Sequence, residues 1–499
     1  THSAWLVAGL ALCLAATLYN YLAARVWWLL FPAFLLYLAA THRATFRRLW
    51  RPVLGGLLLA ALLVVPMFVY LQLHPEAQTR LQMLDSTLGR ALRGELAPLL
   101  RNVSSGLLAF VWPGAGDQFL AYNIPGRPVL NGASAVFFVT GIVVALRRWR
   151  QPAYAFLLLW FAIGIVPSLL TGATANTTRN AGAMPATYLL AAAGFVAIAQ
   201  LARQRRPALA PLYTGLAVLW LLLSAGLTAD AYFRRWGQSP DVRAAYQHTL
   251  VAQLAYLKSA PQPAVISSVY PGAAHDPGIG LVLAGEQPQW RWVDARTALA
   301  FPHGEPALLV APSSTPLHPV FTTWSEPLET IELRPDDLDP SFTAYHMVPP
   351  AWPGGANAQF GTERPALALL DAGWRDTGTQ PGAVAEIVLV WQVLHPAGVG
   401  PQQPGIDATD VVFFTHVMAP DGTILAQQDA IAAPSWDWEA GDIVVQIHQI
   451  PVAAGSAPGE YETRVGLYDR QSQGRLPRYR PGDGAPADTA LVESLRVIP

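Results

Sequence analysis

Arg179 is the residue that the sequence places best for binding a phosphoryl group. It belongs to the segment Thr177-Thr-Arg-Asn-Ala-Gly-Ala-Met-Pro185, where small residues surround it and no acidic residue is close in sequence. Small neighbours let a head group approach the backbone, and the helix that Pro185 begins favours an anion at its N-terminus. Arg179 and Asn180 are therefore candidate phosphate ligands. The alternative is that Arg179 only anchors its loop.

A second candidate site is the tight turn Tyr19-Asn-Tyr-Leu-Ala-Ala-Arg25, which lies between two apolar segments. The planar donors of Arg25 suit phosphoryl oxygens, and Tyr21 is included with it as a candidate. The alternative is an aromatic anchor at a membrane interface, in which the charged end of Arg25 reaches water.

A third candidate site lies between Trp112 and Pro128, where glycines and prolines indicate a shaped loop. Its candidate residues are Asp117, Asn123 and Arg127. The carboxylate of Asp117 is suited to hydrogen-bond sugar hydroxyls or to bind a divalent metal, which would then be a cofactor. The alternative is that Asp117 stabilises a turn.

The elements that must position these segments are apolar runs of about 17 to 20 residues, long enough to cross the hydrocarbon core of a membrane. They predict about seven transmembrane helices within residues 1–228, and no comparable run follows. The expected helices cover residues 4–19, 26–40, 53–71, 129–146, 154–170, 185–202 and 208–227.

Arginines beside these runs predict the orientation of the helices, because basic residues flanking a span tend to remain cytoplasmic. They lie in alternate loops, and two arginines after the last span argue weakly against this arrangement. The clusters are Arg43, Arg47, Arg48 and Arg51; Arg147, Arg148 and Arg150; and Arg203, Arg205 and Arg206. The three candidate segments and everything after residue 227 are then expected outside the cytoplasm, in a multi-pass protein of the cell membrane.

Two exterior modules are expected after the last span. In residues 229–334, strand-like and helix-like runs alternate, which is typical of a small α/β unit. In residues 335–499 the apolar period becomes two, and Asp421-Gly422 separates two strand-like runs as a hairpin turn. This pattern predicts a β-sandwich, with the segment 335–363 as the linker before it.

Several kinds of chemistry are excluded or weakened by the sequence. The formal net charge of -1 gives no basic field for nucleic acid, and the single cysteine, Cys13, allows no intrachain disulfide. No phosphate-binding glycine loop, zinc motif or serine-nucleophile motif stands in a suitable context. Trp436 and Trp438, in a proline-containing loop, are candidates for stacking on sugar rings, whereas Trp391 alternates with aliphatic residues and is expected in the core.

The order of these motifs resembles the C-terminal part of bacterial GT-C type glycosyltransferases. The resemblance rests on the turn ending at Arg25, the Asn123-Ile-Pro-Gly-Arg-Pro segment, the Arg179-Asn-Ala-Gly-Ala-Met-Pro segment and the arginine-rich loops. It is strongest to the branch of the dolichyl-phosphate-mannose-protein mannosyltransferases and aminoarabinose transferases. The strand-rich tail, with Gly466-Leu-Tyr-Asp469, is similar to the β-sandwich appended to many such proteins.

This resemblance implies transfer of a sugar from a polyprenyl-phosphate carrier to a glycan or protein acceptor at the outer membrane face. In that family the catalytic base lies in the first exterior loop, and this sequence is expected to begin after it, so the base would lie upstream of Thr1. The alternative function is a membrane-anchored carbohydrate-binding or envelope scaffold protein. Seven spans with polar turns exceed what simple anchoring requires, which favours the enzyme.

Overall fold

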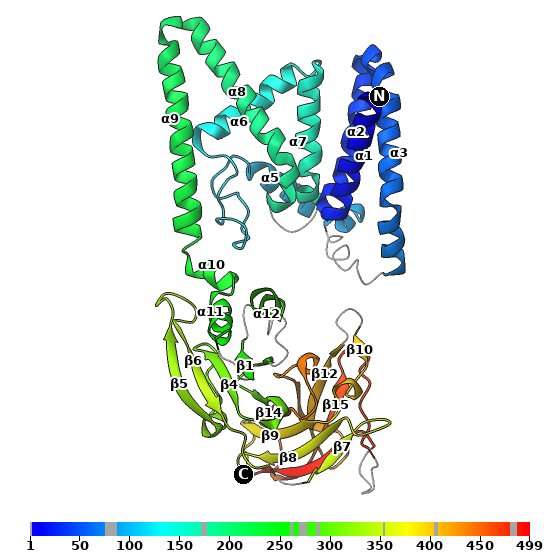
Figure 1. The fold of residues 1–499 in the computed structure, drawn as a ribbon, viewed down its shortest axis with the longest axis vertical. Coiled ribbons are helices and arrows are strands. Elements are labelled where there is room, and N and C mark those ends of the chain that lie inside the picture. The colour runs from blue at the N-terminus through cyan, green and yellow to red at the C-terminus, as the bar shows by residue number, and fades with distance from the viewer. Residues whose placement is uncertain are drawn as a thin grey trace. The chain divides into compact units, whose positions relative to one another are not determined.

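The computed structural model describes residues 2–74, 87–170, 177–259, 263–268, 277–285, 290–352, 355–403, 408–479 and 487–499. The chain forms two compact units, Thr1–Ser239 and Pro240–Pro499. The first is helical and the second is rich in strands (Figure 1). Parts of the segments 72–128 and 172–184, which join expected helices, lie outside the described residues, as does Val269 in a strand-like run of the expected α/β unit.

The helical unit contains all seven of the expected apolar helices. Five described helical segments are long and apolar enough to cross a membrane, and two further apolar helices are shorter. An additional helix, α5 (Leu96–Leu108), lies within the long loop between the third and fourth of them. The seven are α1 (His2–Asn20), α2 (Trp27–Thr41), α3 (Arg43–Leu73), α6 (Gly132–Arg147), α7 (Pro152–Leu170), α8 (Met184–Arg205) and α9 (Ala210–Ala229).

Small residues allow close packing between α6 and α8. A Cβ atom added to Gly141 would lie 1.8 Å from the Leu190 carbonyl oxygen, and one added to Gly194 would lie 1.9 Å from that of Phe137. The two backbones therefore touch at these glycines, as helices do at interfaces inside membranes. Large apolar side chains such as Leu62 and Leu221 remain exposed on α3 and α9, and a lipid environment would cover such faces.

The three arginine clusters lie at chain reversals of the helical unit. The first occupies the opening turns of α3, directly after the break at His42, and the second lies between α6 and α7. The Tyr37 hydroxyl near the end of α2 donates to the Trp149 carbonyl between α6 and α7, at 2.9 Å. This bond joins the first two clusters at one end of the unit, and the third lies at the turn between α8 and α9 (Figure 1).

The second unit begins with an α/β sheet. The strands follow the order β2-β1-β4-β6-β5, with β1 parallel to both β2 and β4, and β6 antiparallel to β4 and β5. Helices α10 (Pro240–Ala245), α11 (His248–Leu257) and α12 (Pro277–Ala284) accompany it. The strands are β1 (Ala264–Ser267), β2 (Trp290–Val293), β4 (Ala307–Pro312), β5 (Ser325–Glu332) and β6 (Ser341–Met347).

Two further sheets pack face to face as a sandwich. One has the order β13-β12-β15-β16 and the other the order β3-β14-β9-β8-β7. Trp391 of β9 is fully buried, and its ring stacks on Phe413 of β12 at 4.9 Å, so the expectation that Trp391 belongs to the core is confirmed. The strands are β3 (Ala298–Phe301), β7 (Ala358–Phe360), β8 (Leu367–Trp374), β9 (Val384–Val393), β12 (Val411–Met418), β13 (Ile424–Ala430), β14 (Ile443–Pro451), β15 (Gly459–Asp469) and β16 (Ala490–Val497).

The expected hairpin is also present, since β12 and β13 pair antiparallel on either side of Asp421-Gly422. Gly422 has a φ of 83°, and the Asp421 carboxylate accepts from the backbone and hydroxyl of Thr423. A left-handed glycine in such a turn carries no Cβ penalty. The turn chemistry read from the sequence therefore closes this hairpin.

The pairing of strands crosses the expected module boundary between residues 334 and 335. Strands β5 and β6, which lie on either side of that boundary, pair in one sheet, so the segment 335–363 is not simply a linker. Strand β3, from the expected α/β module, pairs with β14 and completes a sandwich sheet. Pairing of strands across the expected boundary depends on contacts between residues distant in sequence, and the periodicity of apolar residues does not reveal such contacts. The helical unit also extends past residue 228, through the π-helical turn Asp230–Trp236.

Candidate functional site

Two of the three candidate segments pack on α7, at the end opposite the arginine-rich loop before it. The short helix Thr177–Ala183 comes after the C-terminal end of α7 in the sequence. The indole of Trp160, on α7, donates to the Gly182 carbonyl at 3.0 Å. Trp27, two residues after Arg25, also packs on Gly182, where an added Cβ would lie only 2.2 Å from its ring. Only glycine fits there. The turn containing Arg25 is thereby brought against the segment containing Arg179.

The third segment is tied to the Arg179 segment by a hydrogen-bonded clasp. Asp117 is buried, and its Oδ2 accepts from the Thr177 backbone N–H at 2.8 Å and from the Thr177 hydroxyl at 3.2 Å. The same hydroxyl lies 2.8 Å from Asn123 Oδ1. The second carboxylate oxygen, Oδ1, accepts from Phe119 N–H. All three candidate segments therefore meet at this end of the helical unit.

Asp117 consequently has a positioning role. Both of its oxygens accept hydrogen bonds, one closing a turn and the other joining two loops. Within the described parts of the chain, no group of three or more His, Cys, Asp or Glu side chains could hold a metal ion. The alternative role expected for Asp117, stabilising a turn, corresponds to its bond with Phe119 N–H. The bond with Thr177 joins two loops and was not evident from the sequence.

Some buried polar atoms around the clasp have no hydrogen-bond partner among the described residues. They are Nε of Arg25, Nδ2 of Asn123 and Oδ1 of Asn180. Buried polar atoms are usually hydrogen-bonded, so such a group calls for a partner such as water, an ion or a ligand. Arg179 is half-buried in the same segment and makes interactions of its own. Tyr21 is 45% exposed and directly precedes the short helix Leu22–Val26, which contains Arg25, without a side-chain capping bond.

Arg127 lies on a different side of the same loop. Its guanidinium donates to the Thr228 hydroxyl at 3.4 Å, at the end of α9. Here Arg127 lines an open hollow of about 430 Å³ together with apolar residues and with Arg235, which is paired with Asp230 at 2.9 Å. The 113–128 loop thus carries Asn123 towards the Thr177 segment and Arg127 towards α9.

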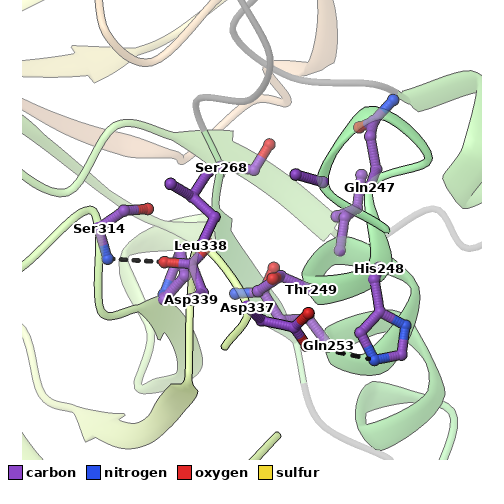
Figure 2. A pocket seen from close by; sticks show the side chains of 12 residues that line it. Gln247, His248, Thr249, Gln253, Ser268, Ser314, Asp337, Leu338 and Asp339 are labelled. Atoms are coloured by element: carbon purple, nitrogen blue, oxygen red, sulfur yellow. Dashed lines mark hydrogen bonds and ion pairs between the residues drawn. The ribbon is translucent and has the colours of Figure 1, made fainter. Parts of the chain in front are cut away.

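The strand-rich unit has a small cleft at the carboxyl ends of β1 and β4, where α/β sheets commonly bind ligands. Figure 2 shows Asp339 accepting from the Ser314 N–H, at 2.7 Å, and His248 beside Asp337. Asp337 is engaged by Arg243, and the cleft holds only about 30 Å³. That volume suits a water molecule rather than a sugar.

The chain matches no protein-family model and no curated protein sequence. Among solved structures, it is similar to one described as the crystal structure of the C-terminal domain of wzt. The two share 13% sequence identity, and the match covers 30% of this chain and 82% of that chain with a TM-score of 0.19. A similarity at this level carries no argument about fold or function.

Sequence reasoning did not single out Thr177, Trp27 or Trp160, which assemble the site. Thr177 was visible only as a neighbour of Arg179, and the indoles are ordinary components of apolar runs. The signal that could have found them is the conjunction of Gly182 with tryptophans in two preceding apolar runs. Large rings require a glycine wherever they press on a backbone.

Proposed function

We propose that the chain is part of a GT-C type membrane glycosyltransferase. It would move a sugar from a polyprenyl-phosphate carrier to a glycan or protein acceptor on the outer side of the cell membrane. The observation that carries the proposal is the convergence of three polar segments around the Asp117–Thr177 clasp, at one end of a unit of apolar helices. An anchor would need no such convergence.

The chemistry fits the charges of this site. A polyprenyl phosphate gains negative charge as the glycosidic bond breaks, and fixed cationic donors stabilise that charge. Arg25 and Arg179 would provide them, with Arg127 on the neighbouring face of the loop. Asn123 and Asn180 would hydrogen-bond the head group or sugar. The carboxylate that deprotonates the acceptor is not assigned to a described residue.

The membrane orientation belongs to this proposal. The arginine-rich turns would lie in the cytoplasm, so that the clasp and the strand-rich unit lie outside. A lipid-linked donor would then reach the site from the bilayer, and the exposed apolar faces of α3 and α9 would contact membrane lipid.

The test is sugar transfer by the natural full-length protein in proteoliposomes, with radiolabelled polyprenyl-phosphate sugars compared with the corresponding nucleotide sugars. Transfer is expected from the lipid-linked donor only. Thr177→Val removes the two hydroxyl contacts but keeps the side-chain shape and the backbone bond to Asp117. The hydroxyl has one proton to share between its two acceptors, so its loss costs about 1 kcal/mol, and the looser clasp should slow transfer about fivefold.

Thr214→Val is the matched control, because Thr214 lies on α9, where its hydroxyl donates to Ala210 and accepts from Arg203 of α8, and has no contact with the clasp. It should transfer sugar at the wild-type rate. Failure of the well-folded wild-type protein to transfer from any polyprenyl-phosphate sugar would reject the enzyme and leave the scaffold interpretation.

A further inference from the structure

An open hollow of about 350 Å³ lies in the strand-rich unit, between β2, α12 and the loop that contains Trp436. Its volume falls in the range of small-ligand sites. The residues that give it chemical character are Trp290, Arg291, Trp292, Trp436, Asp437 and Glu439. All lie within Pro240–Pro499, so the hollow is independent of the clasp in the helical unit.

Two indoles remain partly accessible in this hollow. Trp290 and Trp436 are half-buried, whereas Trp292 is 4% exposed and supports them from the core of the α/β sheet. Trp438, although it also borders the hollow, stacks on Phe413 and donates to the Ala433 carbonyl. The expectation of sugar stacking therefore applies to Trp436 rather than to Trp438, which belongs to the sandwich core.

The polar side chains of the hollow are held in place. Arg291 is 1% exposed and donates to Asp442 through Nε at 2.5 Å and Nη2 at 3.2 Å. Its Nη2 also lies 3.0 Å from Glu439, whose side chain is 41% exposed and so reaches solvent. Arg291 also donates to the Trp290 carbonyl and so serves to hold Glu439. The Glu439 carboxylate is thus fixed before any ligand arrives, which lowers the entropic cost of binding.

Asp437 adds a different kind of group. Its Oδ2 accepts from the Trp292 backbone N–H at 2.8 Å. Desolvation raises the pKa of Asp437 to about 8, so this carboxyl group holds a proton more readily than an ordinary aspartate. Acidic side chains therefore surround the buried guanidinium of Arg291, with His303 at 3.2 Å from Glu439, and a cluster with this many carboxyl groups disfavours phosphate or other anions.

We propose that this hollow binds an uncharged glycan chain, with sugar rings against Trp290 and Trp436 and hydroxyl groups on Glu439 and Asp437. A pyranose ring has an apolar face of C–H groups and a rim of hydroxyls. Half-exposed indoles cover such a face, and rigid planar polar groups hydrogen-bond such a rim. The inference goes beyond sugar transfer and does not depend on it.

Binding is measured with the full chain in a detergent that has no sugar head group, by calorimetry and tryptophan fluorescence. The probes are mannotetraose, maltotetraose, cellotetraose and chitotetraose, with choline as a cationic comparison. Saturable binding of at least one oligosaccharide is expected. Trp436→Ala and Glu439→Gln should each weaken it at least about tenfold, or about 1.4 kcal/mol, and Trp436→Phe should recover part of the loss.

Trp374→Ala is the matched control, because Trp374 is half-buried on β8 and does not line the hollow. It should bind like the wild type. The proposal is overturned if none of the oligosaccharides binds the folded wild type, or if choline alone binds. It is also overturned if Glu439→Gln and the folded Trp436 variants bind with wild-type affinity. Thermal unfolding of each variant establishes that it is folded.

Discussion

Asp442→Asn should strongly destabilise the strand-rich unit. Asp442 is fully buried and accepts four hydrogen bonds, two from the Arg291 guanidinium and one each from the backbone N–H groups of His303 and Glu439. Asparagine has nearly the same volume, so no cavity forms. However, asparagine carries no charge, and its amide N–H₂ group would face N–H donors of Arg291 or of the backbone, with which it cannot form hydrogen bonds.

The magnitude follows from the burial of Arg291, which is 1% exposed. Removing one partner of a buried ion pair costs about 3 to 5 kcal/mol, because the other charge remains buried. Glu439 still reaches Arg291 at 3.0 Å, which places the expected loss near the lower value. Since a whole domain is stable by only about 5 to 15 kcal/mol, the loss is a large fraction of the total.

The assay is urea unfolding of the fragment Pro240–Pro499, which corresponds to one compact unit. The matched control is Asp410→Asn, which breaks the exposed pair between Asp410 and Arg470 and should cost at most about 1 kcal/mol. In an Arg291→Met background, Asp442→Asn should cost much less, because the buried charge is gone. Equal losses for Asp442→Asn and Asp410→Asn would refute the reasoning.

Three other outcomes are expected. His448 is fully buried, and desolvation lowers its pKa to about 4, so the unfolded chain binds more protons between pH 4 and about 6.5. Stability should therefore fall by roughly 3 kcal/mol as the pH drops through this range, and urea titrations of His448→Gln should lack this component. Gly194→Ala should lower the thermal stability of the detergent-solubilised chain, because its Cβ would lie 1.9 Å from the Phe137 carbonyl oxygen; Gly215→Ala, which meets nothing within 4 Å, should not. Accessibility labelling of tags beside Arg48, Arg148 and Arg205 should place them in the cytoplasm and a tag after Pro499 outside; the reverse pattern would reject the orientation.

The apolar helices could be predicted from the sequence because hydrophobic length is a local property. All seven expected runs are helical, and one of the helix-like runs of the expected α/β unit, residues 277–284, is α12. Alternation likewise identified β9, in which Ile387, Leu389, Trp391 and Val393 are all fully buried. Period and length need no knowledge of what an element packs against.

The parts that could not be predicted depend on long-range contacts. Nothing local in Ala298–Phe301 tells that β3 pairs with β14, about 140 residues later, because four buried apolar residues fit either sheet equally well. The ion pair between Arg291 and Asp442 is hidden for the same reason. In the candidate site, the arginines and Asp117 were visible as unusual residues in apolar surroundings, but the contact of Asp117 with Thr177 spans separate loops.

The most direct test of the proposed function is sugar transfer by Arg179→Ala in the natural full-length protein, with a polyprenyl-phosphate sugar as the donor. If Arg179 stabilises the departing phosphate, its loss should slow transfer by about 10² to 10³, by analogy with the loss of one oxyanion donor. Arg179→Lys should recover only part of the rate, since an ammonium group cannot make the bidentate contact. Arg101→Ala, which removes an exposed arginine from α5, should leave transfer unchanged. Transfer at the wild-type rate by folded Arg179→Ala would contradict the phosphate-binding role of the site.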